Sequence, residues 1–302
     1  TNVKDGIMKI GFVGLGNMGT GMANNILKKI NNKSDLFVYT RTLEKIEKMT
    51  AMGATGCNSI EDITKKVDVL LTCLPNVETS KELFMGNGGI FEFANSNQVL
   101  VDHSTVDVKT SKECFDSAKQ KGLNFLDAPI SGGPGGAADG TLTIMVGGEK
   151  SSFDKAKEAF NMMGAKISLM GPSGAGTAMK LVNQLLVSTN TVAAAEAFVL
   201  AEQSGVNLSA AIDILSTSWG RSTMIERNGP ITVNKEFENS PAPLRNLVKD
   251  IGIIKDLTDQ LGLKLPVTMA SSDVVDETMK LNLNEPDIAA TALSIKKISG
   301  IE

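Results

Sequence analysis

The 302-residue sequence contains little histidine and little cysteine, and each shortage excludes a kind of chemistry. His103 is the only histidine, so a metal centre built on several histidines is excluded, and any histidine-dependent catalysis must use this residue. Its place at the end of an apolar run favours a structural role over a chemical one. The three cysteines, Cys57, Cys73 and Cys114, are widely spaced and odd in number, which is typical of reduced thiols in a cytosolic compartment and not of a metal cluster.

A strong charge of one sign and long apolar runs are also missing. The formal net charge is −4, which gives no general attraction to nucleic acid or to anionic membranes. We find no apolar run as long as a bilayer-spanning helix requires. Residues 1–6 are polar and lack the basic and apolar segments of an export signal. We therefore expect a cytoplasmic protein without nucleic-acid or membrane partners, and a mitochondrial matrix location stays open because a leader could precede Thr1.

The most informative segment present is a glycine-rich turn near the N-terminus. An apolar strand pattern enters Gly14-x-Gly16-x-x-Gly19, and an apolar helical pattern leaves it. The first glycine permits the tight turn, the second lets the backbone approach a pyrophosphate, and the third lets the helix pack closely on the strand. The N–H groups at the helix start, with their partial positive charge, suit a diphosphate. The predicted dinucleotide-binding residues of this turn are Gly14, Leu15, Gly16, Asn17, Met18 and Gly19.

Strands and helices alternate through the first half of the chain, which predicts an α/β fold with a doubly wound sheet of Rossmann type over residues 1–171. The expected strands span 7–13, 36–40, 67–74, 99–102, 124–127 and 141–146, and a helix spans 152–163. From residue 172 to 302 the pattern is helical and predicts an all-α domain joined to the first by a long helix. The expected helices there span 177–204, 208–216, 244–261, 266–281 and 287–299. Because such a domain commonly pairs with a copy of itself, we expect a homodimer or homotetramer.

The end of the second expected strand indicates which dinucleotide is bound. NAD-specific folds place an acidic residue about 20 residues after the glycine turn, where it binds the ribose 2′-hydroxyl. This chain has Thr40, Arg41 and Thr42 there, and Lys45 lies one turn into the next helix. An arginine and a hydroxyl bind a 2′-phosphate that a carboxylate would repel. We therefore expect NADP(H) to be preferred and NAD(H) to be possible; a solvated arginine that tolerates either cofactor is the alternative.

Two further strand ends carry candidate cofactor contacts. Leu74-Pro75-Asn76 and Ser104-Thr105 follow expected strands at their carboxyl ends, where ligands of open α/β sheets bind. Hydroxyl groups at this position can form hydrogen bonds with a nicotinamide amide or a ribose. The predicted cofactor contacts at these two ends are Leu74, Pro75, Asn76, Thr79 and Thr105.

Two later segments are more specific. In residues 127–142, Ser131, Gly132 and Gly133 stand among several glycines, whose backbone N–H groups form a cradle suited to a carboxylate; a flexible loop is the alternative. In residues 174–184, Lys180 and Asn183 lie one helical turn apart on one face. A lysine on an otherwise apolar helix is costly to bury, and it can donate a proton to a developing alkoxide.

Together these segments resemble the β-hydroxyacid dehydrogenases, the family of 3-hydroxyisobutyrate dehydrogenase, tartronate semialdehyde reductase and glyoxylate/succinic semialdehyde reductases. The likeness extends from about Lys9 to Ser299 and is carried by a DAPxSGG-type loop and a GAGxxxKLxN helix. It implies hydride transfer between a nicotinamide cofactor and a small carboxylate substrate, a β-hydroxyacid or its semialdehyde or keto acid. It also implies that Lys180 is the catalytic acid/base, that Asn183 contacts substrate, that Ser131, Gly132 and Gly133 hold the substrate carboxylate, and that Leu74, Pro75, Thr105 and Lys249 bind the cofactor.

The chain departs from the family pattern in two places. Gln184 follows Asn183 where many members have a second asparagine, and the only tryptophan lies in Ser218–Ser222, where members vary with substrate. The identity of the acid is therefore not predicted. Arg221 is either a partner for a second polar substrate group or an ordinary surface arginine.

Two other functions stay open, a non-catalytic cofactor-binding interaction module and an imine reductase. The first would lack the lysine and the second typically replaces it, so Lys180 argues against both. A relative such as 6-phosphogluconate dehydrogenase would need a much larger helical domain than this chain provides. We expect no metal site.

Overall fold

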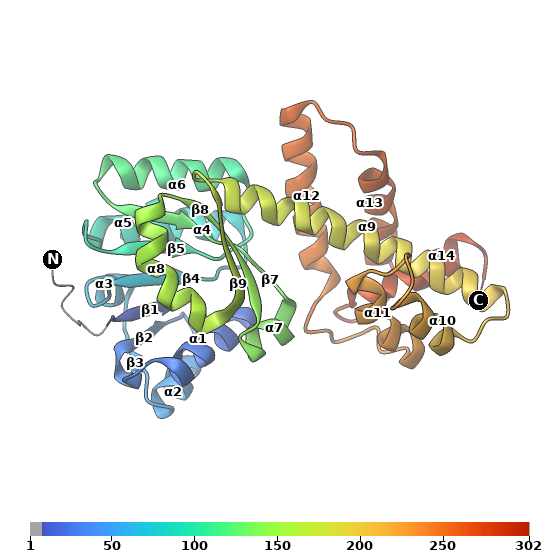
Figure 1. Ribbon diagram of the computed structural model, residues 1–302, viewed down its shortest axis with the longest axis horizontal. Coiled ribbons are helices and arrows are strands. Elements are labelled where there is room, and N and C mark those ends of the chain that lie inside the picture. The colour runs from blue at the N-terminus through green and yellow to red at the C-terminus, as the bar shows by residue number, and fades with distance from the viewer. Residues whose placement is uncertain (1–7, 302) are drawn as a thin grey trace. The chain divides into compact units, whose positions relative to one another are not determined.

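The computed structural model describes residues 8–301, which fold into two compact units that divide between Lys180 and Leu181 (Figure 1). The division falls inside one long helix, α9 (Ala175–Gln203), nine residues after the domain boundary that was predicted between residues 171 and 172. The predictions made for residues 1–7, the polar start of the chain and the first residue of the first strand, lie outside the described residues.

The first unit is built on a nine-stranded sheet in which β3-β2-β1-β4-β5-β6 are neighbours and run parallel. β8 then pairs antiparallel with both β6 and β7, and parallel with β9. The strands are β1 Ile10–Val13, β2 Leu36–Tyr39, β3 Thr55–Gly56, β4 Val69–Thr72, β5 Val99–Asp102, β6 Asn124–Asp127, β7 Ile130–Ser131, β8 Leu142–Gly148 and β9 Gly164–Gly171. The Rossmann-type sheet is confirmed, with an antiparallel addition that the sequence pattern did not indicate.

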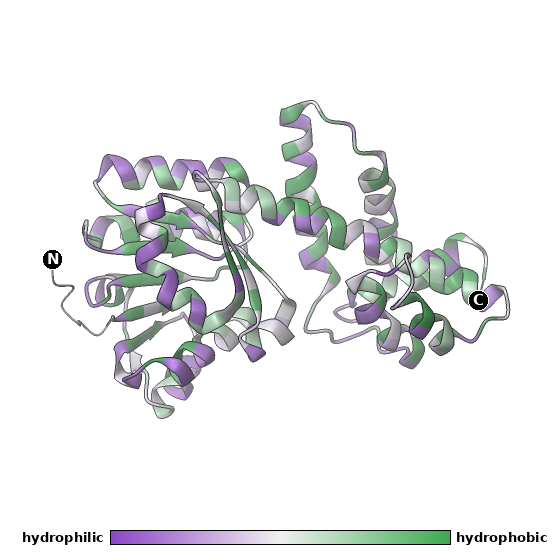
Figure 2. Ribbon diagram, in the orientation of Figure 1, coloured by the Kyte–Doolittle hydropathy of each residue, from purple (hydrophilic) through white to green (hydrophobic). Residues whose placement is uncertain are grey.

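Helices cover both faces of this sheet, and Figure 2 shows mostly green strands between helices that carry purple, hydrophilic residues. The helices are α1 Asn17–Lys29, α2 Leu43–Ala51, α3 Ile60–Thr64, α4 Val77–Met85, α5 Ile90–Phe93, α6 Val108–Gln120, α7 Gly133–Asp139 and α8 Lys150–Met163, with a 3-10 turn, η1, at Lys33–Asp35. Alternate strand residues enter different apolar clusters: Phe12 and Leu71 pack with α1 and α8, whereas Val13 and Leu70 pack with α4 and α6. Burial on both faces explains the unbroken apolar runs of β1, β4 and β5.

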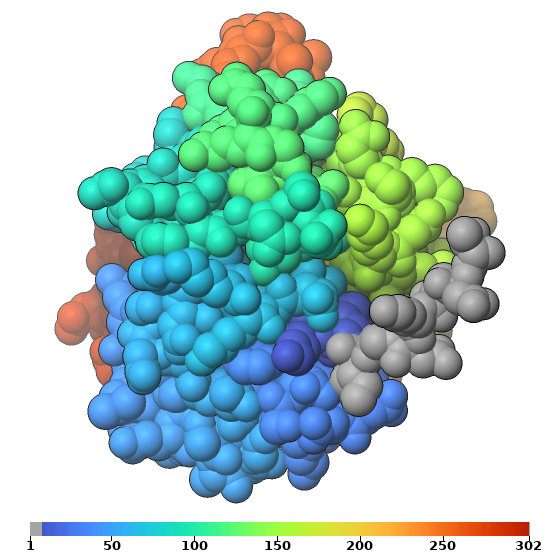
Figure 3. Space-filling model, turned by 90° about the vertical axis from the view of Figure 1, so that its left-hand side faces the viewer, coloured from blue at the N-terminus to red at the C-terminus, as the bar shows by residue number. Residues whose placement is uncertain are grey.

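Figure 3 shows the face of the first unit that is on the left in Figure 1, where segments from the first half of the chain, blue to green, form most of the surface.

The second unit is helical, as predicted. It contains the remainder of α9 followed by α10 Leu208–Leu215, α11 Thr223–Asn234, α12 Leu244–Leu261, α13 Pro266–Met279, η2 Ile288–Ala290 and α14 Thr291–Ile298. α9 supplies side chains to two apolar clusters, Val192 to one with α12 and α13, and Phe198 to one with α10 and α11. It is therefore the central helix of this unit.

Within residues 8–301, α9 is also the one helix long and apolar enough, by length and composition alone, to cross a membrane. The sequence interpretation did not anticipate this, because polar residues, including Asn183, Gln184 and those at 188–191, divide the helix into short apolar runs. A central helix of a helical domain passes the same test, and α9 has that place in the second unit.

Candidate active site

The carboxyl end of β1 carries the predicted glycine turn. Gly14 has a φ of +97°, and a Cβ there would lie 2.3 Å from the Cys73 carbonyl oxygen. A Cβ on Gly19 would lie 1.9 Å from the Gly14 carbonyl oxygen, whereas one on Gly16 would meet none of the described atoms within 4 Å. α1 starts directly after Gly16, which has no side chain to cap it, and no acidic residue lies in its first turn. The space at Gly16 and the N–H groups of α1 fit a pyrophosphate. The other residues predicted for this turn, Leu15, Asn17 and Met18, lie between these three glycines.

Cationic side chains lie beside the turn, because β2 pairs in parallel with β1 and ends at the same edge. Arg41 and Thr42 are exposed directly beyond β2. Lys45 Nζ donates a hydrogen bond to the Leu15 carbonyl oxygen at 2.8 Å, which holds the ammonium group against the glycine turn. The three predicted residues therefore lie together, with a charge that fits a 2′-phosphate.

The ends of β4 and β5 are joined to each other at this same edge. Leu74 N donates to Ser104 Oγ at 2.8 Å. Asp102, which is 3% exposed, accepts hydrogen bonds from the hydroxyls of Thr72 and Ser80 and from Ser104 N. Asp102 was missed by the sequence interpretation; it fixes the two strand ends against each other.

The other predicted residues of these strand ends differ in what they can offer a ligand. Pro75 is exposed and Thr105 is half-buried at this edge. Asn76 Oδ1 accepts from Thr79 N at 2.8 Å and thereby caps α4. The Asn76 oxygen and the Thr79 N–H are thus used within the protein, which leaves the Asn76 amide nitrogen and the Thr79 hydroxyl for a cofactor.

The only histidine is a buried structural residue at the end of β5. His103 is 1% exposed, and its Nδ1 lies 2.6 Å from the Ala128 carbonyl oxygen, which can only accept, so Nδ1 carries the hydrogen. Its Nε2 has no hydrogen-bond partner among residues 8–301. Burial lowers the pKa of His103 from 6.5 to about 4, so the ring is neutral at physiological pH.

This burial predicts an acid-sensitive contribution to stability. The unfolded chain protonates His103 near pH 6.5, but the folded chain does so only near pH 4, so stability falls as the pH is lowered between these values. We expect a loss of about 3 kcal/mol in the free energy of unfolding over this window. Urea denaturation at several pH values checks it, with His103→Gln as the comparison. A difference between the two proteins that does not change with pH would contradict the assignment.

The glycine-rich segment predicted to hold a carboxylate is partly helical. Gly132 and Gly133 have φ angles of +136° and +62°, and α7 begins there, where the sequence suggested only a glycine-rich loop. Asn25, which is 4% exposed on α1, places its Nδ2 2.7 Å from the Ala137 carbonyl oxygen and 3.0 Å from that of Ala138. Asn25 therefore ties α7 to the helix that begins at the glycine turn. Ser131, Gly132 and Gly133 are accessible at the start of α7.

Lys180 lies in the second turn of α9, and the first turn is fixed by Asp127 at the end of β6. Asp127 Oδ1 accepts from Gly174 N and its Oδ2 from Thr177 N, both at 2.8 Å. Burial raises the pKa of Asp127, and these backbone donors oppose that rise. A Cβ on Gly176 would lie 2.3 Å from a carbonyl oxygen of β8, so the helix start also packs closely on the sheet. Lys180 itself is 7% exposed.

The predicted residues of the second unit lie in one polar network. Asn183 Nδ2 donates to Gln184 Oε1 at 3.0 Å, and Gln184 Nε2 donates to Asp250 Oδ2 at 2.6 Å. Lys249 Nζ lies 3.3 Å from Asp250 Oδ1. The structure thus joins Asn183 on α9 to Lys249 on α12 through Gln184 and Asp250, to which the sequence interpretation assigned no role. Arg221 is exposed before α11.

Metal-binding clusters and cysteine thiols were the other features considered in the sequence. Among residues 8–301 no three His, Cys, Asp or Glu side chains gather as metal ligands would. Cys57 and Cys114 are buried free thiols, and burial raises the pKa of Cys57 to about 12 and that of Cys114 further.

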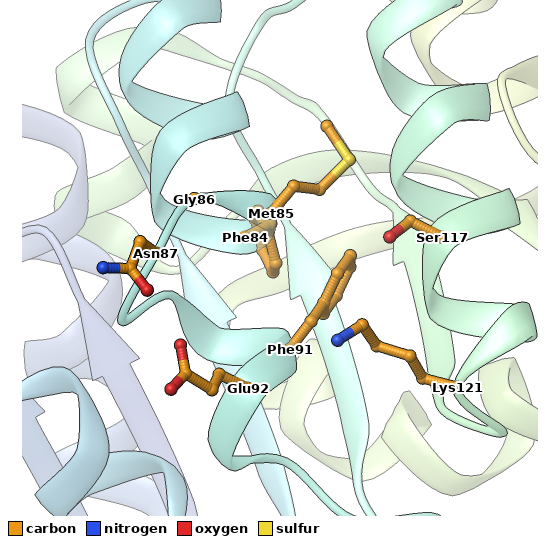
Figure 4. Close-up of a pocket in the computed structure, with 8 residues that line it drawn as sticks. All are labelled: Phe84, Met85, Gly86, Asn87, Phe91, Glu92, Ser117 and Lys121. Atoms are coloured by element: carbon orange, nitrogen blue, oxygen red, sulfur yellow. The ribbon is translucent and has the colours of Figure 1, made fainter.

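A cavity of about 340 Å³ lies between α4, α5 and α6. Figure 4 shows Lys121 extending toward Phe91 in it. Because α4 and α6 run back across a parallel sheet, their C-terminal ends lie at the edge opposite the glycine turn. The cavity is lined by Phe84, Met85, Gly86, Asn87, Phe91, Glu92, Ser117 and Lys121.

A parallel sheet with an open glycine turn, cationic neighbours and a buried lysine defines the class of nicotinamide dinucleotide-binding oxidoreductases. Residues 9–171 match the family described as the NAD-binding domain of 6-phosphogluconate dehydrogenase. Residues 174–294 match the one described as NAD-binding of NADP-dependent 3-hydroxyisobutyrate dehydrogenase. The chain belongs to the β-hydroxyacid dehydrogenase family.

Individual relatives agree with this family. The chain is 30% identical to 2-(hydroxymethyl)glutarate dehydrogenase of Eubacterium barkeri, covering 97% of each protein. It is 30% identical to glyoxylate/succinic semialdehyde reductase 1 of Arabidopsis thaliana, covering 96% of this chain and 99% of the relative. The solved 3-hydroxyisobutyrate dehydrogenase of Mycobacterium tuberculosis with L-serine has a TM-score of 0.85 at 27% identity, covering 96% and 100%. Imine reductases match at 16–18% identity and TM-scores of 0.59–0.60, which shows a shared fold alone.

Proposed function

We propose that the protein interconverts a small β-hydroxyacid and its semialdehyde or keto acid, with NADP(H) preferred and Lys180 as the general acid/base. The observation that carries this proposal is the placement of Lys180. It is nearly buried, and its helix is fixed by Asp127 to the sheet edge that holds the glycine turn. A nearly buried ammonium group, on a helix that starts at the sheet edge carrying the glycine turn, is a candidate for proton transfer to a substrate bound at that edge.

A nicotinamide bound at this edge would supply or accept a hydride at its C4 atom. In the reduction, the carbonyl oxygen gains negative charge as its carbon takes the hydride, and the Lys180 ammonium group gives that oxygen a proton. In the oxidation, the neutral Lys180 amine takes the hydroxyl proton. Proton transfer from a side chain held in place contributes about 10²- to 10⁴-fold to the rate.

Substrate orientation is assigned to the start of α7. The backbone N–H groups of Gly132 and Gly133 and the Ser131 hydroxyl suit a carboxylate, and Asn25 keeps α7 on the helix that follows the glycine turn. A fixed carboxylate holds the reacting carbon in one place, and such positioning lowers the barrier through entropy.

A substrate panel tests the proposed function. The purified protein is assayed with NADPH or NADP⁺, and with NADH or NAD⁺, against succinic semialdehyde, glyoxylate, tartronate semialdehyde, 3-hydroxyisobutyrate, L-serine and threonate. We expect turnover of at least one of these acids. Turnover of cyclic imines alone would assign the protein to the imine reductases. Cofactor binding without any turnover would favour a non-catalytic interaction module.

Arg41 is the residue that we expect to set cofactor preference. Arg41→Ala should raise the KM for NADPH roughly 10- to 100-fold, because a charge-assisted hydrogen bond contributes about 1.5–3 kcal/mol. The KM for NADH should stay nearly constant, since NADH lacks the 2′-phosphate. Steady-state kinetics with both cofactors measures the two changes.

The matched control for Arg41 is Lys48→Ala. Lys48 is an exposed cation on α2 that pairs with Glu44 at 2.6 Å, so its loss removes the same charge without touching the proposed site. A wild-type protein that prefers NADH, or equal losses with both cofactors in Arg41→Ala, would refute the role of Arg41.

We also propose that the chain forms a homodimer or homotetramer through α9. Val182, Leu186 and Leu200 are 51%, 53% and 69% exposed on this otherwise central helix. Their spacing of four and then fourteen residues places them on one stripe. Light scattering of the purified protein measures the oligomeric state, and a monomer would refute the proposal.

A further inference from the structure

A chain of three side chains in the second unit joins α9 to α12. Asn183 Nδ2 donates to Gln184 Oε1 at 3.0 Å, and Gln184 Nε2 donates to Asp250 Oδ2 at 2.6 Å. Asp250 is 5% exposed, and Asn183 and Gln184 are half-buried. The Asp250 end of the chain is therefore shielded from water, where the geometry of a hydrogen bond has the greatest effect.

The direction of every bond in this chain follows from Asp250. A carboxylate only accepts hydrogen bonds, so the Gln184 amide must present its nitrogen to Asp250. Its oxygen then faces Asn183, and that oxygen accepts from the Asn183 nitrogen. The Asn183 oxygen consequently points away from Gln184. An amide can otherwise turn over and exchange its nitrogen and oxygen.

Two cations lie near this chain. Lys249 on α12 lies 3.3 Å from Asp250 Oδ1, although that oxygen has no hydrogen-bond partner among residues 8–301. Lys180 lies four residues before Gln184 on α9, one helical turn away.

We propose that Asp250 and Gln184 are positioning residues, which fix the Asn183 amide so that its oxygen is the group offered to the substrate. This inference depends on the proposed function, since Asn183 is there assigned to substrate binding. An amide oxygen accepts from the hydroxyl of a hydroxyacid, whereas the nitrogen of a reversed amide can only donate. The glutamine at position 184 matters because its extra methylene group, compared with asparagine, extends the amide toward α12.

The decisive variant is Gln184→Glu, which puts a second carboxylate next to Asp250. At low pH the two carboxylates share a proton, so the introduced glutamic acid donates to Asp250 and still accepts from Asn183, as glutamine does. At high pH both are charged and repel each other, and the Asn183 amide is no longer fixed. We expect the kcat/KM of the variant, divided by that of the wild type at the same pH, to rise about tenfold or more as the pH is lowered from about 8 to about 5.

A compensating pair of substitutions tests the same claim in the opposite direction. In Asp250→Asn alone, the new amide can donate to or accept from Gln184, so the order of the bonds is lost and kcat/KM should fall about tenfold at every pH. In Gln184→Glu/Asp250→Asn, the introduced carboxylate accepts from both the introduced amide and the Asn183 amide, which restores the Asn183 orientation. The double variant should recover most of the activity at about pH 8.

Gln203→Glu is the control, because it adds the same charge at an exposed position near the end of α9. Its activity relative to wild type should not vary with pH, and NADPH affinity should be unchanged in Gln184→Glu and in this control. A Gln184→Glu activity ratio that is constant with pH, or a double variant no better than the single ones, would overturn the proposal. If the wild type turns over no substrate of the panel, the proposed function fails. The melting temperature then still tests whether the carboxyl groups at positions 184 and 250 share a proton. Gln184→Glu must then lose more Tm with rising pH than the double variant does.

Discussion

Replacing Lys180 with alanine should lower kcat by about 10²- to 10⁴-fold, the usual contribution of a positioned general acid or base. The side chain is 7% exposed, on a helix start that Asp127 fixes through two backbone hydrogen bonds. Removing the ammonium group takes away the proton donor and leaves the glycine turn untouched. NADPH affinity, measured by titration of cofactor fluorescence, should therefore remain close to that of the wild type.

Two companion variants separate loss of chemistry from loss of structure. Lys157→Ala removes an exposed lysine on α8 and should keep full activity. Lys180→Arg keeps the positive charge but cannot give up its proton near neutral pH, so it should remain almost as impaired as alanine. Full turnover by Lys180→Ala would remove this residue from the reaction.

The second large effect is expected at the glycine turn. Replacing Gly19 should lower the stability of the protein, whereas replacing Gly16 should weaken NADPH binding. Gly19→Ala places a Cβ 1.9 Å from the Gly14 carbonyl oxygen, so the free energy of unfolding should fall by roughly 1–3 kcal/mol or more. A Cβ at position 16 would have none of the described atoms within 4 Å, so the Gly16→Ala protein without cofactor should be as stable as the wild type. Its methyl group would occupy the space assigned to the pyrophosphate, and the Kd for NADPH should rise at least about tenfold.

Thermal denaturation with and without NADPH distinguishes the two cases. Without NADPH, Gly16→Ala should have the Tm of the wild type, and NADPH should raise its Tm only slightly. Gly19→Ala should have a lower Tm than the wild type both with and without NADPH. Gly252→Ala, at a position on α12 that is also open within 4 Å, serves as the control. Undiminished NADPH affinity in Gly16→Ala would show that the dinucleotide does not bind over this turn.

Sequence patterns predicted those parts of the fold that depend on local periodicity. β5, β6 and α12 have the predicted bounds, because buried strands have apolar centres and an amphipathic helix repeats its apolar face. The pattern did not predict β9, whose residues are largely half-exposed, or α7, whose glycines and proline are poor helix formers. α7 is stable because Asn25 binds its last carbonyl groups from α1, a contact between residues 112 positions apart.

In the candidate site, too, some residues were predictable from the sequence and others were not. The glycine turn and the residues of the parallel strand ends were predictable, since parallel topology brings successive strand ends to one edge. Asn25, Asp102, Asp127 and Asp250 were not assigned a role, because their partners lie far away in the sequence. All four are nearly fully buried polar residues, and only the folded structure shows which groups form hydrogen bonds with them.

The central claim is hydride transfer to a small carboxylate substrate with the proton supplied by Lys180. The most direct test uses NADPH deuterated at the transferring position of nicotinamide C4, an acid semialdehyde or keto acid, and NMR of the product. The account predicts deuterium on the carbon that bears the new hydroxyl group in the wild type, and almost none in Lys180→Ala at the same time point. Product without deuterium on that carbon, or equal labelling by the two proteins, would contradict it.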